Sequence, residues 1–215
     1  MVLAVIFIWQ ERYLPLSFIL LFLSMVPFYR RFERKKAKAE VVVVIAVLAA
    51  IAAVSRVPFM ALPGIQPTSF VVITAALVFG PEVGFLVGST SALASNLFLG
   101  QGPWTPWQMF SWGMMGLSAG YLYRFAWMQN RIGLGIFGFC WGFLFGWIMN
   151  LWIVVGFFET INWGTFAGVY AASFYFDLAH GLSNVFFIVL FSRQWKKMLE
   201  RASRKFGILG HTEER

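Results

Sequence analysis

A stripe of polar side chains in the last long apolar segment has a spacing that could support chemistry. Ser173, Asp177, His180 and Asn184 are separated by four, three and four residues, so a helix places all four on one face. Asp177 lies about 12 residues, or about 18 Å at 1.5 Å per residue, from the outer end of that helix. Ionisable groups at such depth face protein or water and are functional candidates. The alternative is an internal Asp177–His180 pair that holds two helices together.

Further polar and aromatic residues fall in the neighbouring apolar segments. Asn96, Gln108, Trp112 and Asn150 each map to the half of a predicted helix that we expect to lie toward the outside of the cell. Amides can form paired hydrogen bonds, and indole rings offer stacking surface with one polar N–H group. The simplest geometry that gathers these side chains is a polar, aromatic cavity that opens outward.

The run 100–108, Gly-Gln-Gly-Pro-Trp-Thr-Pro-Trp-Gln, is the most unusual stretch of the chain. Its two glycines and two prolines predict a loop between two apolar segments. Trp104 and Trp107 lie inside it, where a linker would ordinarily be small and polar. They are either anchors at a membrane interface, where indoles commonly lie, or part of a rigid aromatic loop that covers a ligand chamber. We carry the second interpretation forward as a hypothesis.

The composition identifies the class of protein. Of 215 residues, 60% are hydrophobic and 12% are charged, whereas soluble domains carry roughly 25% charged residues. Apolar runs near membrane-spanning length recur along the chain, which predicts an all-α polytopic membrane protein. The net charge of +8 comes largely from two basic clusters beside apolar segments, so it indicates topology and a lipid bilayer, not nucleic acid. The single cysteine, Cys140, excludes a disulfide framework.

Several catalytic classes lack their sequence motifs. The chain has no phosphate-binding Gly-x-x-x-x-Gly-Lys-Ser/Thr loop, no Gly-x-Ser-x-Gly elbow and no His-Glu-x-x-His helix. Asp177 and His180 would give a metal only two obvious ligands, fewer than a zinc site needs, so we expect no metal site. The sequence therefore favours a binding protein without its own energy source over an enzyme.

The apolar runs divide the chain into three parts. Residues 1–39 hold one extra N-terminal transmembrane helix, at 13–29, and a basic cytoplasmic linker. Residues 40–192 form a core of six transmembrane helices, and 193–215 form a basic cytoplasmic tail. The six core helices are expected at 41–54, 70–79, 83–99, 109–123, 133–157 and 165–191.

Basic residues predict the orientation of this arrangement. Six of the nine residues 30–38 are basic, and such clusters remain on the cytoplasmic side of a membrane. With the second basic cluster also inside, the C-terminus is cytoplasmic and the extra helix places the N-terminus outside. Arg12 and Arg56 are then counted on the outside.

The first core helix carries small residues at spacing four. Ala46 and Ala50 form one such pair, and Ala49 and Ala53 form another. Small side chains allow close backbone approach between helices in lipid. Each pair serves either packing inside the bundle or contact with another protein.

Several of these features together resemble one family. The run 64–68 (Gly-Ile-Gln-Pro-Thr), the turn 79–85 (Phe-Gly-Pro-Glu-Val-Gly-Phe), the aromatic loop and the run 177–180 (Asp-Leu-Ala-His) are similar to those of the substrate-binding S components of energy-coupling factor (ECF) transporters. The resemblance covers about residues 41–192. The most similar type is the cobalamin-type S component.

This resemblance implies a function and a set of partners. An S component captures a vitamin from outside, and an Ala-x-x-x-Ala face of its first core helix docks on a transmembrane scaffold subunit. Ala46/Ala50 and Ala49/Ala53 both match that face. Two cytoplasmic ATPase subunits use ATP to drive import, so this chain itself would be neither an enzyme nor the holder of a cofactor.

Trp104, Trp107, Gln108, Trp112, Asn96, Asn150, Asp177 and His180 are the residues expected to bind the vitamin. A corrin has an apolar face and a rim of amides, which suits indole and amide side chains, and a flavin would suit the same residues. For His180 we expect a hydrogen-bonding role and not cobalt ligation. The alternatives from other classes are an intramembrane enzyme that uses Asp177 and His180, and an assembly or scaffold subunit without a ligand.

Overall fold

Helices account for all the regular secondary structure in the residues that the computed structural model describes, which are 13–34, 39–158 and 161–208. The predicted all-α fold is confirmed, with no strand in those ranges. The predictions that concern residues 1–12, 35–38, 159–160 and 209–215 lie outside the described part. The helices are α2 (Tyr13–Arg34), α3 (Ala39–Val54), the 3-10 turn η1 (Val57–Phe59), α4 (Pro67–Phe79), α5 (Pro81–Leu99), α6 (Thr105–Leu122), α7 (Ala126–Gln129), α8 (Arg131–Phe157) and α9 (Trp163–Lys205).

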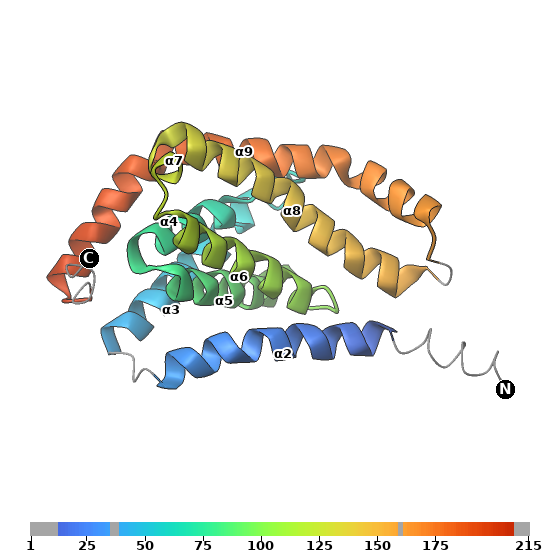
Figure 1. Cartoon of the computed structure of the whole chain (residues 1–215), viewed down its shortest axis with the longest axis horizontal. Helices are drawn as coiled ribbons and strands as arrows, with labels where there is room; N and C mark the ends of the chain where they lie inside the picture. The colour runs from blue at the N-terminus through green and yellow to red at the C-terminus, as the bar shows by residue number, and fades with distance from the viewer. Residues whose placement is uncertain (1–12, 35–38, 159–160, 209–215) are drawn as a thin grey trace.

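The long helices α8 and α9 run antiparallel along one side of the molecule, and α2 lies along the opposite side (Figure 1). Between them, α4, α5 and α6 pack together. The backbones of α5 and α6 are in direct contact, because a Cβ atom built on Gly88 would lie 2.2 Å from the carbonyl oxygen of Trp112. Gly84 and Gly116 meet in the same way. These small residues therefore serve packing within the bundle.

Four described helices are long and apolar enough to cross a membrane. They are the segment Ala39–Phe59 that includes α3, together with α5, α8 and α9. By contrast, α4 has only 13 residues, and its residues from Pro67 to Val78 are all buried. α4 is thus an internal helix of the bundle, and its surface is covered by protein. The described helices support a multi-pass membrane protein.

Three predicted boundaries were clearly wrong, the first being the end of the extra helix, because α2 continues beyond residue 29 to Arg34. The expected loop 100–108 is shorter, because α6 already begins at Thr105. Pro106 is compatible with this start, since the first turn of a helix leaves its N–H groups unpaired in any case. At the other end of the chain, α9 continues without a break to Lys205, so the described part of the basic tail is largely helical.

The extra N-terminal helix α2 packs against α5. The ring of Phe28 stacks on Phe85 with a centroid distance of 4.2 Å, and the hydroxyl of Tyr29 lies 2.8 Å from Ser89 Oγ. Arg31 Nε lies 2.7 Å from a carboxylate oxygen of Glu82. The turn between α4 and α5 (residues 80–82) contains no basic residue, and Arg31 of α2 provides a basic partner for its Glu82.

Candidate functional site

Two of the motifs singled out in the sequence meet in the structure. Gly64 has a positive φ of +82°, and a Cβ atom built on it would lie 2.7 Å from the carbonyl oxygen of Phe176 and 2.6 Å from Ala179 Cβ. The backbone N–H of Gln66 donates a hydrogen bond to Ser183 Oγ at 3.3 Å. Only glycine allows the loop before α4 to lie so close to the middle of α9.

A cavity of about 250 Å³ lies beside this contact. The loop after α3 provides most of its wall, including Arg56, Phe59 and Gln66, while Leu99 of α5 and Phe176 of α9 complete it. Arg56 is the only charged residue among the described residues of that lining. We call this space the Arg56 cavity.

The guanidinium of Arg56 is held in a fixed position. Its Nη1 donates hydrogen bonds to Ser95 Oγ and, at 3.2 Å, to Asn96 Oδ1. Its Cζ lies 4.9 Å from the centre of the Trp112 ring, a cation–π contact. In the described part of the chain no carboxylate lies within ion-pair distance of Arg56, and Nε and Nη2 have no hydrogen-bond partner. The N–H groups on Nε and Nη2 of Arg56 can therefore donate hydrogen bonds to a bound molecule.

Asn96 connects Arg56 to the start of α6. Its Nδ2 donates to Thr105 Oγ1 at 2.9 Å and to Gln108 Oε1 at 2.8 Å. Both contacts depend on α6 beginning at Thr105, where the side chains of its first turn face the end of α5. The predicted site residues Asn96 and Gln108 are thus in direct contact.

A second chain of contacts runs from Trp112 to α9. Trp112 Nε1 donates to Ser69 Oγ at 3.1 Å, and Ser69 Oγ lies 2.8 Å from His180 Nε2. His180 is completely buried, and its ring packs edge-on against Phe145. Trp112 and His180, both predicted site residues, therefore lie in one network with Arg56. His180 acts there as a hydrogen-bonding group, in contact with α4.

The other two predicted polar residues form a separate cluster between α8 and α9. Asn150 Nδ2 donates to Ser173 Oγ at 2.7 Å, and Ser173 Oγ donates to Asp177 Oδ2 at 2.9 Å. Asp177 Oδ1 is buried beside Gly146 and has no hydrogen-bond partner in the described structure. No bond joins Asp177 to His180 among these residues, so the alternative of an internal Asp–His pair has no support.

The two tryptophans of the aromatic run lie apart from the Arg56 cavity. Trp107 is buried in a cluster with Leu21 of α2 and Trp152 of α8. Trp104 is 37% exposed, and its ring covers Gly102. Neither residue is part of the lining of that cavity. Their role in ligand binding stays a prediction.

The two alanine pairs of α3 lie in different environments. Ala46 and Ala50 are exposed, whereas Ala49 and Ala53 are buried inside the bundle. The second pair is thus used for packing within this chain.

Sequence reasoning missed the central residue of the network. Arg56 was counted only as a charge outside the membrane, although it is the one charged residue between Glu40 and Glu82. A lone charge between two apolar segments was the signal that could have identified it. Ser69 and Gln66 were also missed as site residues, although Gln66 lies in the run 64–68 that was singled out as a motif. The described residues contain no group of three or more His, Cys, Asp or Glu side chains that could hold a metal ion.

Comparison with curated proteins gives matches to part of the chain. The chain is 34% identical over 81 residues to a UPF0397 protein of Aliivibrio fischeri (strain MJ11). The aligned residues make up 38% of this chain and 43% of that protein. It is 38% identical over 64 residues to a UPF0397 protein of Vibrio atlanticus (strain LGP32). That alignment covers 30% of this chain and 35% of the relative. The chain thus spans less than half the length of these relatives. No solved structure matches it.

A protein-family comparison covers far more of the chain. The family described as "ECF transporter, substrate-specific component" matches residues 40–193. That match includes α3 to α8 and the apolar part of α9, and with them both networks of the candidate site. The chain therefore belongs to the family of substrate-specific components of ECF transporters.

Proposed function

We propose that this chain captures a compact, anionic small molecule for an ECF importer, and that the Arg56 cavity is where the anion binds. The observation that carries the proposal is that Arg56 lines a cavity and has no carboxylate within ion-pair distance among the described residues. Removing a cation from water is costly unless an opposite charge or several hydrogen bonds compensate. A ligand carboxylate or phosphate on Nε and Nη2 supplies that compensation.

The size of the cavity bears on the ligand. Pockets for drug-sized ligands occupy about 300–1,000 Å³, and the Arg56 cavity, at about 250 Å³, lies below that range. A corrin is larger than most drug-sized ligands, so the volume favours a smaller solute over cobalamin. A flavin is closer in size but, without a phosphate, lacks the negative charge that Arg56 favours. Gln66, whose buried Oε1 has no partner in the described residues, supplies an acceptor for a ligand N–H or O–H group.

Import requires partner subunits, which we place against α3. Membership in the family supports a transmembrane scaffold and two ATPase subunits as partners. The exposed face with Ala46 and Ala50 also carries the exposed apolar side chains of Val43 and Val47. Small residues on such a face permit close packing of a second helix in lipid. The buried pair Ala49 and Ala53 has no such access.

Equilibrium binding to the purified full-length chain tests the ligand class. The panel contains cobalamin, riboflavin, and the carboxylates biotin, pantothenate and nicotinate. We expect a carboxylate to bind, and Arg56→Gln to weaken its binding about tenfold to a hundredfold, the range for hydrogen bonds to charged groups. Arg124→Gln, which removes an exposed arginine at the other end of α6, is the matched control and should leave the affinity unchanged.

Other outcomes separate the alternatives. Binding of cobalamin or riboflavin that is unaffected by Arg56→Gln would contradict the anion assignment but keep the transport role. A chain that copurifies with scaffold and ATPases yet retains no small molecule, from the panel or from the cell, would instead favour an assembly subunit without a ligand.

Substitutions on α3 test the partner interface. We expect Ala46→Phe/Ala50→Phe to abolish copurification with the scaffold subunit while ligand binding by the isolated chain survives. Ala49→Phe/Ala53→Phe should instead lower the melting temperature of the isolated chain, because the added rings have no space in the bundle. Normal scaffold binding by the first double variant would place the interface elsewhere.

A further inference from the structure

A second cavity, at the opposite end of the bundle, is not used by the proposed function. It has a volume of about 380 Å³ and lies where the ends of α6 and α7, the start of α8 and the last part of α9 meet. Its polar lining includes Tyr123, Arg131, Arg193, Lys196 and Lys197. We call it the basic cleft.

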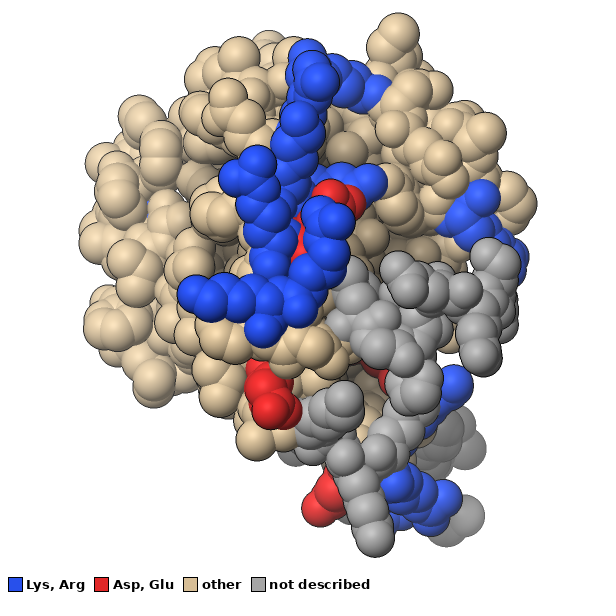
Figure 2. Space-filling view, turned by 90° about the vertical axis from the view of Figure 1, so that its left-hand side faces the viewer, with Lys and Arg blue, Asp and Glu red and all other residues tan. Residues whose placement is uncertain are grey.

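Positive charge dominates this cleft. Among the described residues that line it, four are basic and Glu200 is the only acidic one. Figure 2 shows a band of Lys and Arg across this end of the molecule, with little acidic surface within it. In the described residues Arg131, Arg193 and Lys197 form no ion pair, and all three are exposed. Their charge is thus available to an anion.

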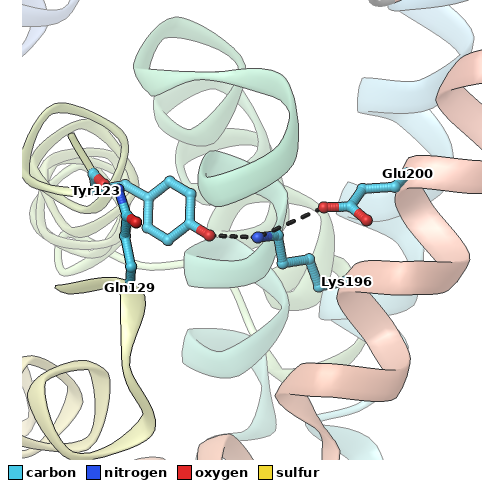
Figure 3. Close-up of polar contacts among 4 residues, drawn as sticks. All are labelled: Tyr123, Gln129, Lys196 and Glu200. Carbon is cyan, nitrogen blue, oxygen red and sulfur yellow. Dashed lines mark hydrogen bonds and ion pairs between the residues drawn. The ribbon is translucent and has the colours of Figure 1, made fainter. Parts of the chain in front are cut away.

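Lys196 is the basic residue of the cleft that has side-chain partners in the described structure. Figure 3 shows its ammonium between the side chains of Tyr123 and Glu200. Nζ donates a hydrogen bond to the Tyr123 hydroxyl, lies 4.8 Å from the centre of that ring, and lies 3.5 Å from Glu200 Oε1. The contact with Tyr123 joins the end of α6 to α9, so one cation of the cleft is fixed in place before any anion arrives.

The cleft lies at a boundary between basic and apolar surface. Leu77, Met128 and Leu134 form an apolar part of its wall. Along α9, Leu190 and Phe186 precede Arg193 by three and seven residues, so they lie on the same face as Arg193. These two side chains are 51% and 55% exposed. A molecule that binds here meets cations at one end and an exposed apolar helix face at the other.

We propose that the basic cleft binds the headgroup of an anionic glycerophospholipid, with its phosphate among Arg131, Arg193 and Lys197 and its acyl chains along Leu190 and Phe186. Basic pockets between helices at a membrane boundary suit such headgroups. A soluble phosphate compound would share the chemistry of the cations but would make no use of the apolar face. That face is the reason for choosing the lipid.

Lipid titration of the full-length chain in a neutral detergent tests the proposal. The probes are dioctanoyl phosphatidylglycerol, dioctanoyl phosphatidylcholine and glycerol 3-phosphate, with bound ligand measured by native mass spectrometry. We expect phosphatidylglycerol to bind in preference to the other two. Arg193→Gln/Lys197→Gln should weaken it roughly thirtyfold, from the attraction of two basic residues to an anionic headgroup.

Arg201→Gln/Arg204→Gln is the matched control, because it removes the same charge from exposed positions of α9 that do not line the cleft. Its affinity should stay within about twofold of the parent. An equal loss of affinity for phosphatidylglycerol in both double variants would show that no specific site exists. Equal binding of phosphatidylglycerol and phosphatidylcholine would show the same. Binding of glycerol 3-phosphate as tight as that of phosphatidylglycerol would overturn the choice of a lipid. If the first double variant does not fold, Arg131→Gln tests the same site from α8.

Discussion

Arg56 and the basic cleft place positive charge in two contrasting ways. At one end of the bundle a single guanidinium is held by Ser95, Asn96 and Trp112 beside a small cavity. At the other end several cations are exposed around a wider cleft, and only Lys196 is fixed by neighbours. A partly buried cation held by several neighbours selects a ligand by shape as well as charge, whereas exposed cations select mainly by charge. Substitutions near the Arg56 cavity should therefore lower the unfolding free energy more than substitutions in the basic cleft.

The largest effect is expected from Gly64→Ala. The new Cβ would meet Ala179 Cβ and the carbonyl oxygen of Phe176 well inside contact distance, at a backbone φ that alanine disfavours. Left-handed strain and overpacking together predict a loss of about 3 kcal/mol in the free energy of unfolding. Chemical denaturation in detergent measures this loss. Gly135→Ala is the control, since a Cβ there meets nothing within 4 Å; equal losses in both variants would contradict the packing argument.

Ser69→Ala should have the next largest effect. It leaves Trp112 Nε1 and His180 Nε2 buried without their shared partner. An orphaned buried polar group costs about 1–3 kcal/mol, so we expect a loss of about 2 kcal/mol in unfolding free energy and weaker ligand binding. Ser69→Cys, which keeps a weak donor and acceptor, should recover part of both. Stability unchanged in Ser69→Ala would mean that the network does not couple α4, α6 and α9.

At the basic end, Tyr123→Phe should have a smaller effect. It removes the hydroxyl that binds Lys196 but keeps the aromatic ring beneath the ammonium. Because the pair is partly exposed and the cation–π contact remains, the unfolding free energy should fall by less than about 1 kcal/mol. Thermal unfolding followed by circular dichroism measures the change. If Tyr123→Phe lowered the unfolding free energy as much as Ser69→Ala, the contrast between the basic cleft and the Arg56 network would be contradicted.

The smallest effect on stability is expected from Lys197→Gln. Its side chain is exposed and forms no ion pair in the described residues, so unfolding free energy should change by less than about 0.5 kcal/mol. The same variant should still bind phosphatidylglycerol more weakly than the parent protein does. Parallel measurement of unfolding and lipid binding would therefore separate charge that holds the fold from charge that attracts a partner.

Hydrophobic patterning predicted most of the helices, because an apolar run is the direct physical requirement of a membrane helix. The run 133–157 became α8 within two residues, and 83–99 became α5 with the same end. The prediction was wrong at the start of α6. There, Pro103 and Pro106 suggested a loop, although the first turn of a helix tolerates proline. It also failed beyond residue 191, because charged residues end an apolar run without ending a helix.

The site was predicted only in part, because its contacts join segments that are far apart in the sequence. Asn96, Gln108, Trp112 and His180 were chosen for their types and depths, and the structure brings them into one network. Arg56, which connects that network to the cavity, could not be placed without knowing how the loop after α3 folds back. Whether these residues bind a ligand stays a prediction.

The continuity of α9 has a mechanical consequence. His180 and Lys196 lie on one unbroken helix, 16 residues and about 24 Å apart. If this part of α9 tilted as one body, a tilt of about 10° about His180 would displace Lys196 by about 4 Å. Such a tilt would widen the contact between Gly64 and α9 and shift Lys196 against Tyr123 together. Gly142 of α8 lies against Gly181, one residue from His180, so a tilt of α9 about this contact would have its displacement at the basic cleft.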